Sequence, residues 1–143
     1  MKNFKSGFTM VELIFVIVIL GILAAVAVPK LSITRDDAQI SKMRADVAAI
    51  KSGINLERGK DLMVGTIAWP DPGTNFDAFI QNGLPSGNDR NGWTMNGTHK
   101  AKACVAGSCT TFTYYQTASE DGKNKAGTFS CNSSDEICKT LSN

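Results

Sequence analysis

An uninterrupted apolar segment with one acidic residue near its start constrains this chain more than any other feature. Residues 13–28 contain no charged side chain, and residues 8–28 would form about 30 Å of helix, which matches the hydrocarbon core of a bilayer. Glu12 stands at the edge of this segment, where a carboxylate costs free energy unless it has a cationic partner. The segment therefore predicts a membrane-spanning helix with a functional carboxylate.

Two common N-terminal signals share part of this pattern. Lys2 and Lys5 before an apolar run, followed by Ala25-Val26-Ala27, match a secretory signal peptide with an A-x-A cleavage site, whose mature chain would start at Val28. A plain transmembrane anchor explains the length equally well. The uncharged run slightly exceeds the usual apolar region of a signal peptide, and neither signal gives Glu12 a role.

The residues around Gly7 favour a third interpretation. Lys5-Ser6-Gly7 is followed by Phe8 and then by Thr9-Met10-Val11-Glu12, which opens the apolar helix. Over residues 1 to about 58, the chain resembles the type IV pilin and type II secretion pseudopilin family, whose mark is this prepilin motif. Gly21 and Pro29 also lie where that family tends to have helix-weakening residues.

The resemblance implies a processing step and an assembly contact. A membrane prepilin peptidase would cut between Gly7 and Phe8 and methylate the new amino group of Phe8. The cut would leave an α-ammonium four residues before Glu12, which we expect on the same face of one helix. In a filament, the family pairs this carboxylate with the Phe8 amino group of a neighbouring subunit. The uncleaved amide carries no charge, so processing would switch assembly on.

A second helical pattern follows the apolar segment. We expect the helix to run from Phe8 to about Arg58, with Gly59 as its stop, Gly21 as a weak point and a kink at Pro29, where one backbone donor is lost. Apolar residues at steps of three and four predict one buried stripe on its second half. These residues are Ile40, Met43, Val47, Ile50 and Ile54.

The C-terminal half is rich in turn-forming residues and predicts a small β-rich head. Residues 70–73 and 85–89 are loops by composition, and residues 76–80 suit one short helical turn. Residues 101–105 and 108–117 flank Ala106-Gly107, which is typical of a two-residue hairpin. In that hairpin Cys104 lies opposite Cys109 in a non-hydrogen-bonded pair, where cross-strand side chains come closest.

The four cysteines indicate disulfide bonds and an oxidising compartment. An even number of them in a small, loop-rich region after an export-like N-terminus is typical of disulfides. Their C-x4-C and C-x6-C spacings, with His99 as the single histidine, do not match a zinc site. Three pairings exist for four cysteines. The hairpin favours Cys104–Cys109, which leaves Cys131–Cys138 to close the C-terminal loop.

We expect no cofactor and no enzymatic activity. Pilins of the family often close the C-terminal loop with a disulfide, whereas major pseudopilins more often use calcium. Glu120-Asp121 and Asp135-Glu136 supply carboxylates without the ligand spacing of a calcium loop, so calcium is kept only as an alternative. His99 has no plausible nucleophile partner. The net charge of +2 becomes zero without residues 1–7, which argues against a basic nucleic-acid surface.

Together these features predict an α+β, pilin-like fold. It would comprise a leader (1–7), a protruding transmembrane and filament-core helix (8–29), an amphipathic continuation (30–59) packed on a small antiparallel sheet, and the head (60–143). We expect a homo-oligomeric filament subunit, held in the bacterial inner membrane with a periplasmic head, then assembled by an inner-membrane platform into a periplasmic or surface fibre. The alternatives are a secreted disulfide-stabilised binding protein and a minor tip subunit that binds cargo or DNA.

Overall fold

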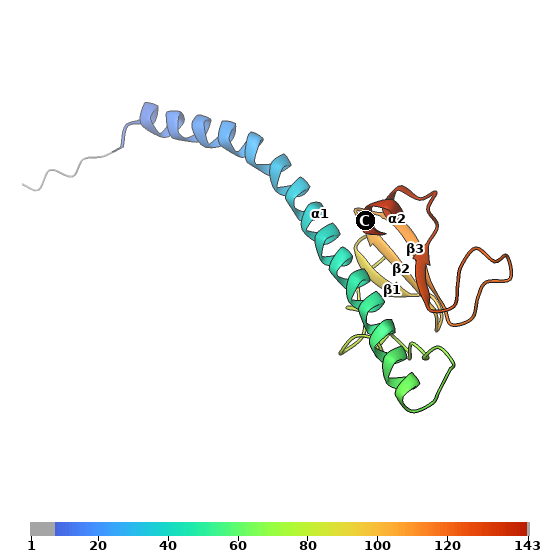
Figure 1. Cartoon of the computed structure of the whole chain (residues 1–143). Coiled ribbons are helices and arrows are strands. Elements are labelled where there is room, and N and C mark those ends of the chain that lie inside the picture. The colour runs from blue at the N-terminus through green and yellow to red at the C-terminus, as the bar shows by residue number, and fades with distance from the viewer. Residues whose placement is uncertain (1–7, 143) are drawn as a thin grey trace, which may run out of the picture. The chain divides into compact units, whose positions relative to one another are not determined.

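The computed structural model of the chain describes residues 8–142, with the backbone alone for residues 28–34. Helix α1 (Met10–Met63) precedes a four-stranded sheet and a short helix α2 (Glu136–Ser142) (Figure 1). The strands are β1 (Gly92–Met95), β2 (Lys100–Val105), β3 (Ser108–Tyr115) and β4 (Thr128–Cys131). This architecture confirms the α+β class. The chain divides into two compact units, residues 1–35 and 36–143.

The first unit is the apolar start of α1. Its window Met10–Ala27 has a mean hydropathy of 2.9 and none of its side chains is buried. It is the one helix among the described residues that is long and apolar enough to cross a membrane. The helix continues through Gly21 without a break. Gly7 and the rest of the predicted leader, and the side chain of Pro29, lie outside the described residues, so the leader and the kink stay predictions.

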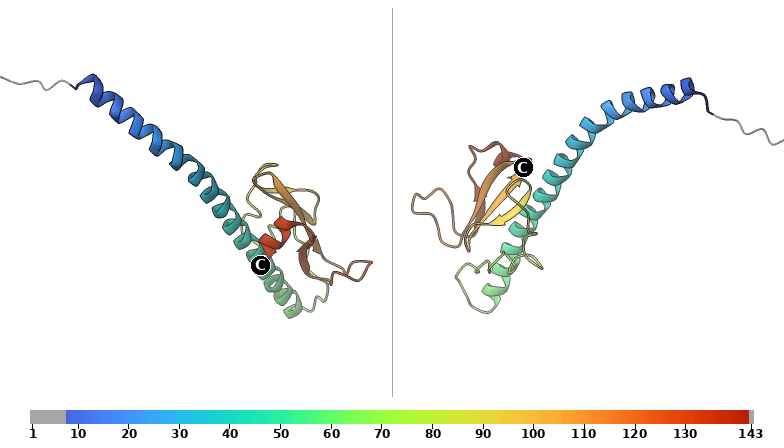
Figure 2. Two further views of the ribbon diagram at one scale, coloured as in Figure 1. Left: turned by 90° about the horizontal axis from the view of Figure 1, so that it is seen from above. Right: turned by 180° about the vertical axis from the view of Figure 1, so that it is seen from behind.

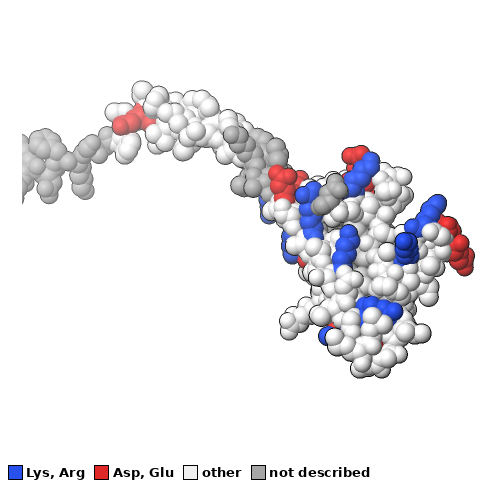
Figure 3. All heavy atoms as spheres, viewed as in Figure 1, with Lys and Arg blue, Asp and Glu red and all other residues white. Residues whose placement is uncertain are grey.

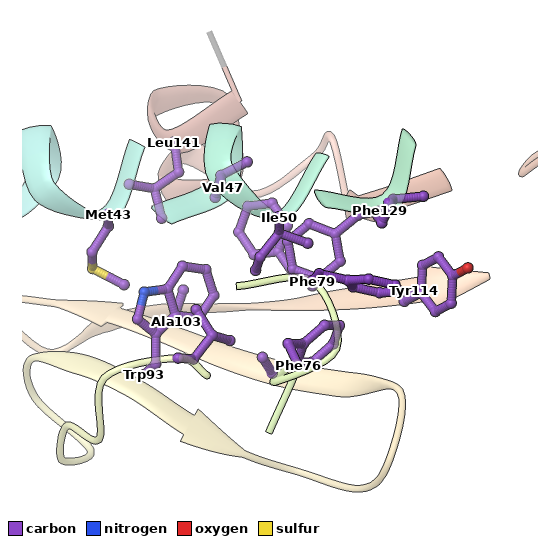
Figure 4. Close-up of a cluster of buried hydrophobic side chains, with 14 of the residues drawn as sticks. Met43, Val47, Ile50, Phe76, Phe79, Trp93, Ala103, Tyr114, Phe129 and Leu141 are labelled. Carbon is purple, nitrogen blue, oxygen red and sulfur yellow. The ribbon is translucent and has the colours of Figure 1, made fainter. Parts of the chain in front are cut away.

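In the second unit, α1 buries the predicted apolar stripe. Met43, Val47, Ile50 and Ile54 are each at most 2% exposed, and Ile40 packs partly buried against the same core. Figure 4 shows the Met43 and Ile50 side chains pointing from the helix toward aromatic side chains of the sheet and the preceding loops. The three-and-four spacing of apolar residues therefore identified the buried face of the helix correctly.

Helix α1 ends at Met63, and the predicted stop at Gly59 is wrong. The cap is Gly65, whose φ of 84° is the left-handed conformation of a helix C-cap. The Gly65 N–H donates to the carbonyl of Leu62 (3.2 Å) and the Thr66 N–H to that of Asp61 (2.8 Å). This pair of bonds is a Schellman motif. Gly59 instead lies within the helix, with no atom near the place of a Cβ.

The sheet is an antiparallel meander of order β1-β2-β3-β4 (Figure 2). Alternate residues of β2 and β3 point into the core, as the two-residue period of a strand requires. The buried residues of these two strands include Ala101, Ala103, Phe112 and Tyr114. Trp93 of β1 and Phe129 of β4 add two aromatic side chains, so every strand contributes to one core beneath the helix stripe.

The β2–β3 hairpin forms as the sequence predicts. Ala106 and Gly107 both have positive φ, 51° and 85°, which a two-residue type I′ turn requires. Val105 pairs with Ser108 and Cys104 with Cys109. The second hairpin strand ends at Tyr115 rather than at residue 117.

Strands β1 and β4 and helix α2 were not predicted. Both strands have only four residues, too few to show a clear alternation of apolar and polar residues. Residues 76–80 form the expected turn, in which the N–H groups of Phe79 and Ile80 both donate to the carbonyl of Phe76 at 3.1 Å. This turn lies so close to α1 that a Cβ on Gly53 would overlap the Phe79 carbonyl.

Candidate functional site

The candidate site is the first turn of α1, which Thr9 caps. The Thr9 hydroxyl oxygen accepts a hydrogen bond from the backbone N–H of Glu12 (3.2 Å), and the Thr9 carbonyl accepts one from the N–H of Leu13 (3.1 Å). Thr9 is therefore the N-cap residue, and Glu12 is the third residue of the helix. The Thr-x-x-Glu spacing is the sequence signal of a capping box, and it could have predicted this role.

Phe8 lies outside the helix, which corrects one expectation from the sequence. The helix begins at Met10, so Phe8 and Glu12 do not share a helix face. The cap explains the difference, because an N-cap residue takes a non-helical conformation and the chain before it leaves the helix axis. The Phe8 side chain is 78% exposed. Its nitrogen belongs to a segment that is not committed to helical hydrogen bonds.

Glu12 is the one charged residue of the apolar segment. Residues 8–29 contain no lysine, arginine or aspartate, and all side chains from Phe8 to Ala27 are exposed. Figure 3 shows a single acidic group on this otherwise uncharged part of the helix. Its position in the first turn is favourable for a carboxylate, because the helix N-terminus carries partial positive charge. A cation from outside this segment would complete the site.

Two disulfides fasten the head. Cys104–Cys109 joins the two strands of the hairpin, and Cys131–Cys138 joins β4 to α2. This is the pairing that the hairpin register favours. Helix α2 also contacts α1, because the Arg44 Nε donates to the carbonyl of Thr140 at 2.6 Å and Leu141 is buried in the core.

One carboxylate of each acidic pair of the head accepts hydrogen bonds from groups of the protein. Asp121 accepts hydrogen bonds from the hydroxyl of Ser119 (2.5 Å) and from the N–H of Lys123 (3.2 Å). The hydrogen bond from Ser119 is the main cause that lowers the pKa of Asp121. Asp135 accepts from the Thr110 hydroxyl at 2.8 Å. Within residues 8–142, no three His, Cys, Asp or Glu side chains form a group that could hold a metal ion.

The aromatic residues and the histidine form structural contacts. Trp93 and Tyr114 are each 2% exposed, and Trp69 lies beneath the guanidinium of Arg58, 4.8 Å from the ring centroid. The His99 ring stacks on Tyr114 with centroids 6.1 Å apart.

Parts of the chain match a known sequence motif and known proteins. Residues 2–28 match the prokaryotic N-terminal methylation motif. Type II secretion system core protein G of Pseudomonas aeruginosa is 31% identical over 65% of this chain and 61% of its own length. The protein of that name from Aeromonas hydrophila is 33% identical over 59% of this chain and 67% of its own length. Type IV major fimbrial protein FimA of Dichelobacter nodosus is 33% identical over 46% of this chain and 45% of its own length.

The matched regions thus span from under half to about two thirds of these relatives. No solved structure matches the chain.

Proposed function

This chain belongs to the family of type IV pilins and type II secretion pseudopilins, and we propose that it is a structural subunit of such a filament. The relatives named above come from both systems, one a fimbrial protein and one a core protein of type II secretion. The subunit would be cut by a prepilin peptidase between Gly7 and Phe8, methylated on Phe8, and assembled from the inner membrane by a platform of other proteins.

The observation that carries this proposal is the lone carboxylate of Glu12 beside a non-helical Phe8. Apart from Thr9, Glu12 and Gly21, residues 8–27 have apolar, exposed side chains, and copies of such a helix would bury one another's surfaces in a bundle. A carboxylate buried there needs a cation. The ammonium that cleavage creates on Phe8 is a cation that each additional subunit brings with it. Because Phe8 lies outside the helix, its nitrogen is accessible to a neighbouring copy.

Disulfides suit this role. The head would function in the periplasm or outside the cell, where disulfides persist. They fasten the hairpin and α2 without a bound ion, so we propose that the head needs no calcium and no other cofactor. We also propose a purely structural role without enzymatic activity, in line with the names of the relatives.

The first test of the proposal is the start of the mature chain. Intact-mass measurement and N-terminal sequencing of the native protein should show N-methylated Phe8 as the first residue. A start at Val28 would support a secreted binding protein with an ordinary signal peptide and would refute the proposal, as would a retained leader.

The second test is substitution of the carboxylate. Glu12→Ala and Glu12→Gln should leave cleavage and methylation intact and should abolish or strongly reduce filaments recovered by shearing and seen by electron microscopy. Glu12→Asp keeps the charge and should retain part of the yield. A normal filament yield from both uncharged variants would contradict the pairing role.

A further inference from the structure

We propose that Thr9 is a positioning residue for assembly, because its hydroxyl caps α1 through the backbone amide of Glu12. Glu12 thus supplies both the carboxylate that would pair with a neighbour and the amide that donates to the Thr9 hydroxyl. The inference rests on the proposed function, in which the Glu12 carboxylate pairs with the terminus of another copy. It adds the means by which one subunit holds that carboxylate in place before the partner arrives.

The geometry ties the carboxylate to the cap over a very short path. The Thr9 Oγ1 lies 3.2 Å from the Glu12 nitrogen, and the Thr9 carbonyl lies 3.1 Å from the nitrogen of Leu13. Two consecutive amides are thereby fixed to one residue. The Cα of Glu12 lies between these two amides, so the backbone from which its carboxylate projects has a defined orientation.

The environment makes this hydrogen bond more important than an ordinary cap. The first four N–H groups of a helix lack carbonyl partners within the helix. In a membrane-spanning helix that starts at Met10, the amide of Glu12 lies deeper than those of Thr9, Met10 and Val11. Water satisfies such groups at the interface but not within hydrocarbon. Thr9 therefore binds the unpaired amide that solvent reaches least.

Loss of the cap has a predictable consequence. N-cap substitutions by residues without a side-chain acceptor shift the equilibrium between a capped and a frayed first turn by about 2- to 30-fold. In a frayed turn the Glu12 carboxylate samples many positions, and pairing with a neighbour must then order it. The filament should consequently form less readily, although the carboxylate, the cleavage site and the apolar surface are all unchanged.

A series of four Thr9 variants separates capping from other roles of this side chain. Ser and Asn are good N-cap residues, whereas Val and Ala have no acceptor. Thr9→Val also keeps the shape of threonine. If capping is the role, Thr9→Ser and Thr9→Asn should behave like the natural protein, and Thr9→Val and Thr9→Ala should both be defective.

The direct measurement is hydrogen exchange of the Glu12 amide in the processed, full-length subunit in lipid nanodiscs. Exchange should become about 2- to 30-fold faster in Thr9→Val and stay within about 2-fold in Thr9→Ser and Thr9→Asn. The amide of Val18, in the middle of the apolar helix, serves as the internal control and should not change. An unchanged Glu12 amide in Thr9→Val would overturn the proposal.

Filament yield, normalised to the amount of N-methylated subunit, completes the test. Yields that follow the capping series support the positioning role. If Ser restores assembly and Asn does not, the hydroxyl has a different partner and the proposal is wrong. The exchange measurement needs no filament, so it still reports the cap if the Glu12 variants assemble normally and the proposed pairing fails.

Discussion

The indole N–H of Trp93 donates a hydrogen bond to the Asp46 carboxylate, with Nε1 and Oδ2 2.9 Å apart. Trp93 is 2% exposed and belongs to β1, the edge strand of the sheet. Asp46 belongs to α1, on the turn between Met43 and Val47 of the buried stripe. The contact therefore fastens an edge strand of four residues to the helix beneath which it packs.

Removal of this acceptor should destabilise the head. Asp46→Ala leaves a buried indole N–H without a partner, which costs about 1–3 kcal/mol. Asp46→Asn keeps an oxygen acceptor but loses the charge, so its cost should be smaller, about 1 kcal/mol. The measurement is the free energy of unfolding in denaturant, followed by tryptophan fluorescence. Asp37→Ala, at an exposed position of the same helix, is the control and should change the free energy of unfolding by less than about 0.5 kcal/mol.

Gly59 and Gly65 should respond to alanine in opposite directions. Gly59 lies in the helix with free space around it, and alanine there lowers the entropy of the unfolded chain, so Gly59→Ala should stabilise by about 0.5–1 kcal/mol. Gly65 has a φ of 84°, which an L-residue with a Cβ adopts at a cost of about 1–2 kcal/mol. Thermal and denaturant unfolding of the two variants would test this. Equal effects would show that the cap does not lie at Gly65.

Gly59 and Gly65 also show why the end of α1 was not predicted correctly. Gly59 and Gly65 lie six residues apart, and each is a candidate helix stop because glycine has a low helix propensity. Reading along the chain, the first of the two is chosen. The actual end depends on the hydrogen bonds of Gly65 and Thr66 to the last turn. The Arg58 guanidinium adds to this, since it donates to the carbonyl of Ala68 (2.5 Å) and so holds the returning loop against the helix. These are contacts between residues up to ten positions apart, beyond what a periodic pattern records.

The sequence motif at the candidate site was easier to recognise than the strands of the head. Gly7, Phe8 and Glu12 form a recognisable motif because unlike residues must occur in a fixed order within a short segment, and their roles in cleavage and pairing stay predictions. The β2–β3 hairpin was predicted because Ala106-Gly107 is a local sequence signal of a two-residue turn. Strand β4, in contrast, exists because Phe129 packs on Phe112, with ring centroids 5.1 Å apart. Phe112 and Phe129 lie far apart in the sequence, so neither segment alone indicates that the two rings will pack together.

Removal of Cys131–Cys138 should free α2 from the head, whereas removal of Cys104–Cys109 should leave the β2–β3 hairpin in place. Cys131–Cys138 holds α2, a helix of seven residues that is too short to be stable alone. Replacing both cysteines by alanine should expose the α2 amides to hydrogen exchange and lower the unfolding free energy by about 2–3 kcal/mol. The matched pair Cys104→Ala with Cys109→Ala removes a loop of similar size. The β2–β3 amides should nevertheless stay protected, because six residue pairs hold that hairpin.

Native-state hydrogen exchange of both double variants would test this prediction. Loss of protection in β2–β3 at the same level as in α2 would show that the first disulfide, rather than the strand ladder, holds the hairpin together.

Tyr114 should make the head less stable at alkaline pH. Its hydroxyl donates to the carbonyl of Pro70 at 2.9 Å, and its side chain is 2% exposed. Burial, helped by the carboxylate of Asp71, raises the pKa of Tyr114 from 10.0 to about 12. The folded protein therefore keeps a proton that the unfolded chain releases above pH 10.

The free energy of unfolding should consequently fall by about 2–3 kcal/mol as the pH rises from 10 to 12, whereas below pH 10 this contribution is fully present. Lysines titrate over the same range, so the measured quantity is the difference between the natural protein and Tyr114→Phe, which retains the ring and its contact with Phe79. That difference should decrease across this window, because the variant has no phenol to ionise. A constant difference would mean that the Tyr114 hydroxyl is open to solvent in the folded protein and ionises there as readily as in the unfolded chain.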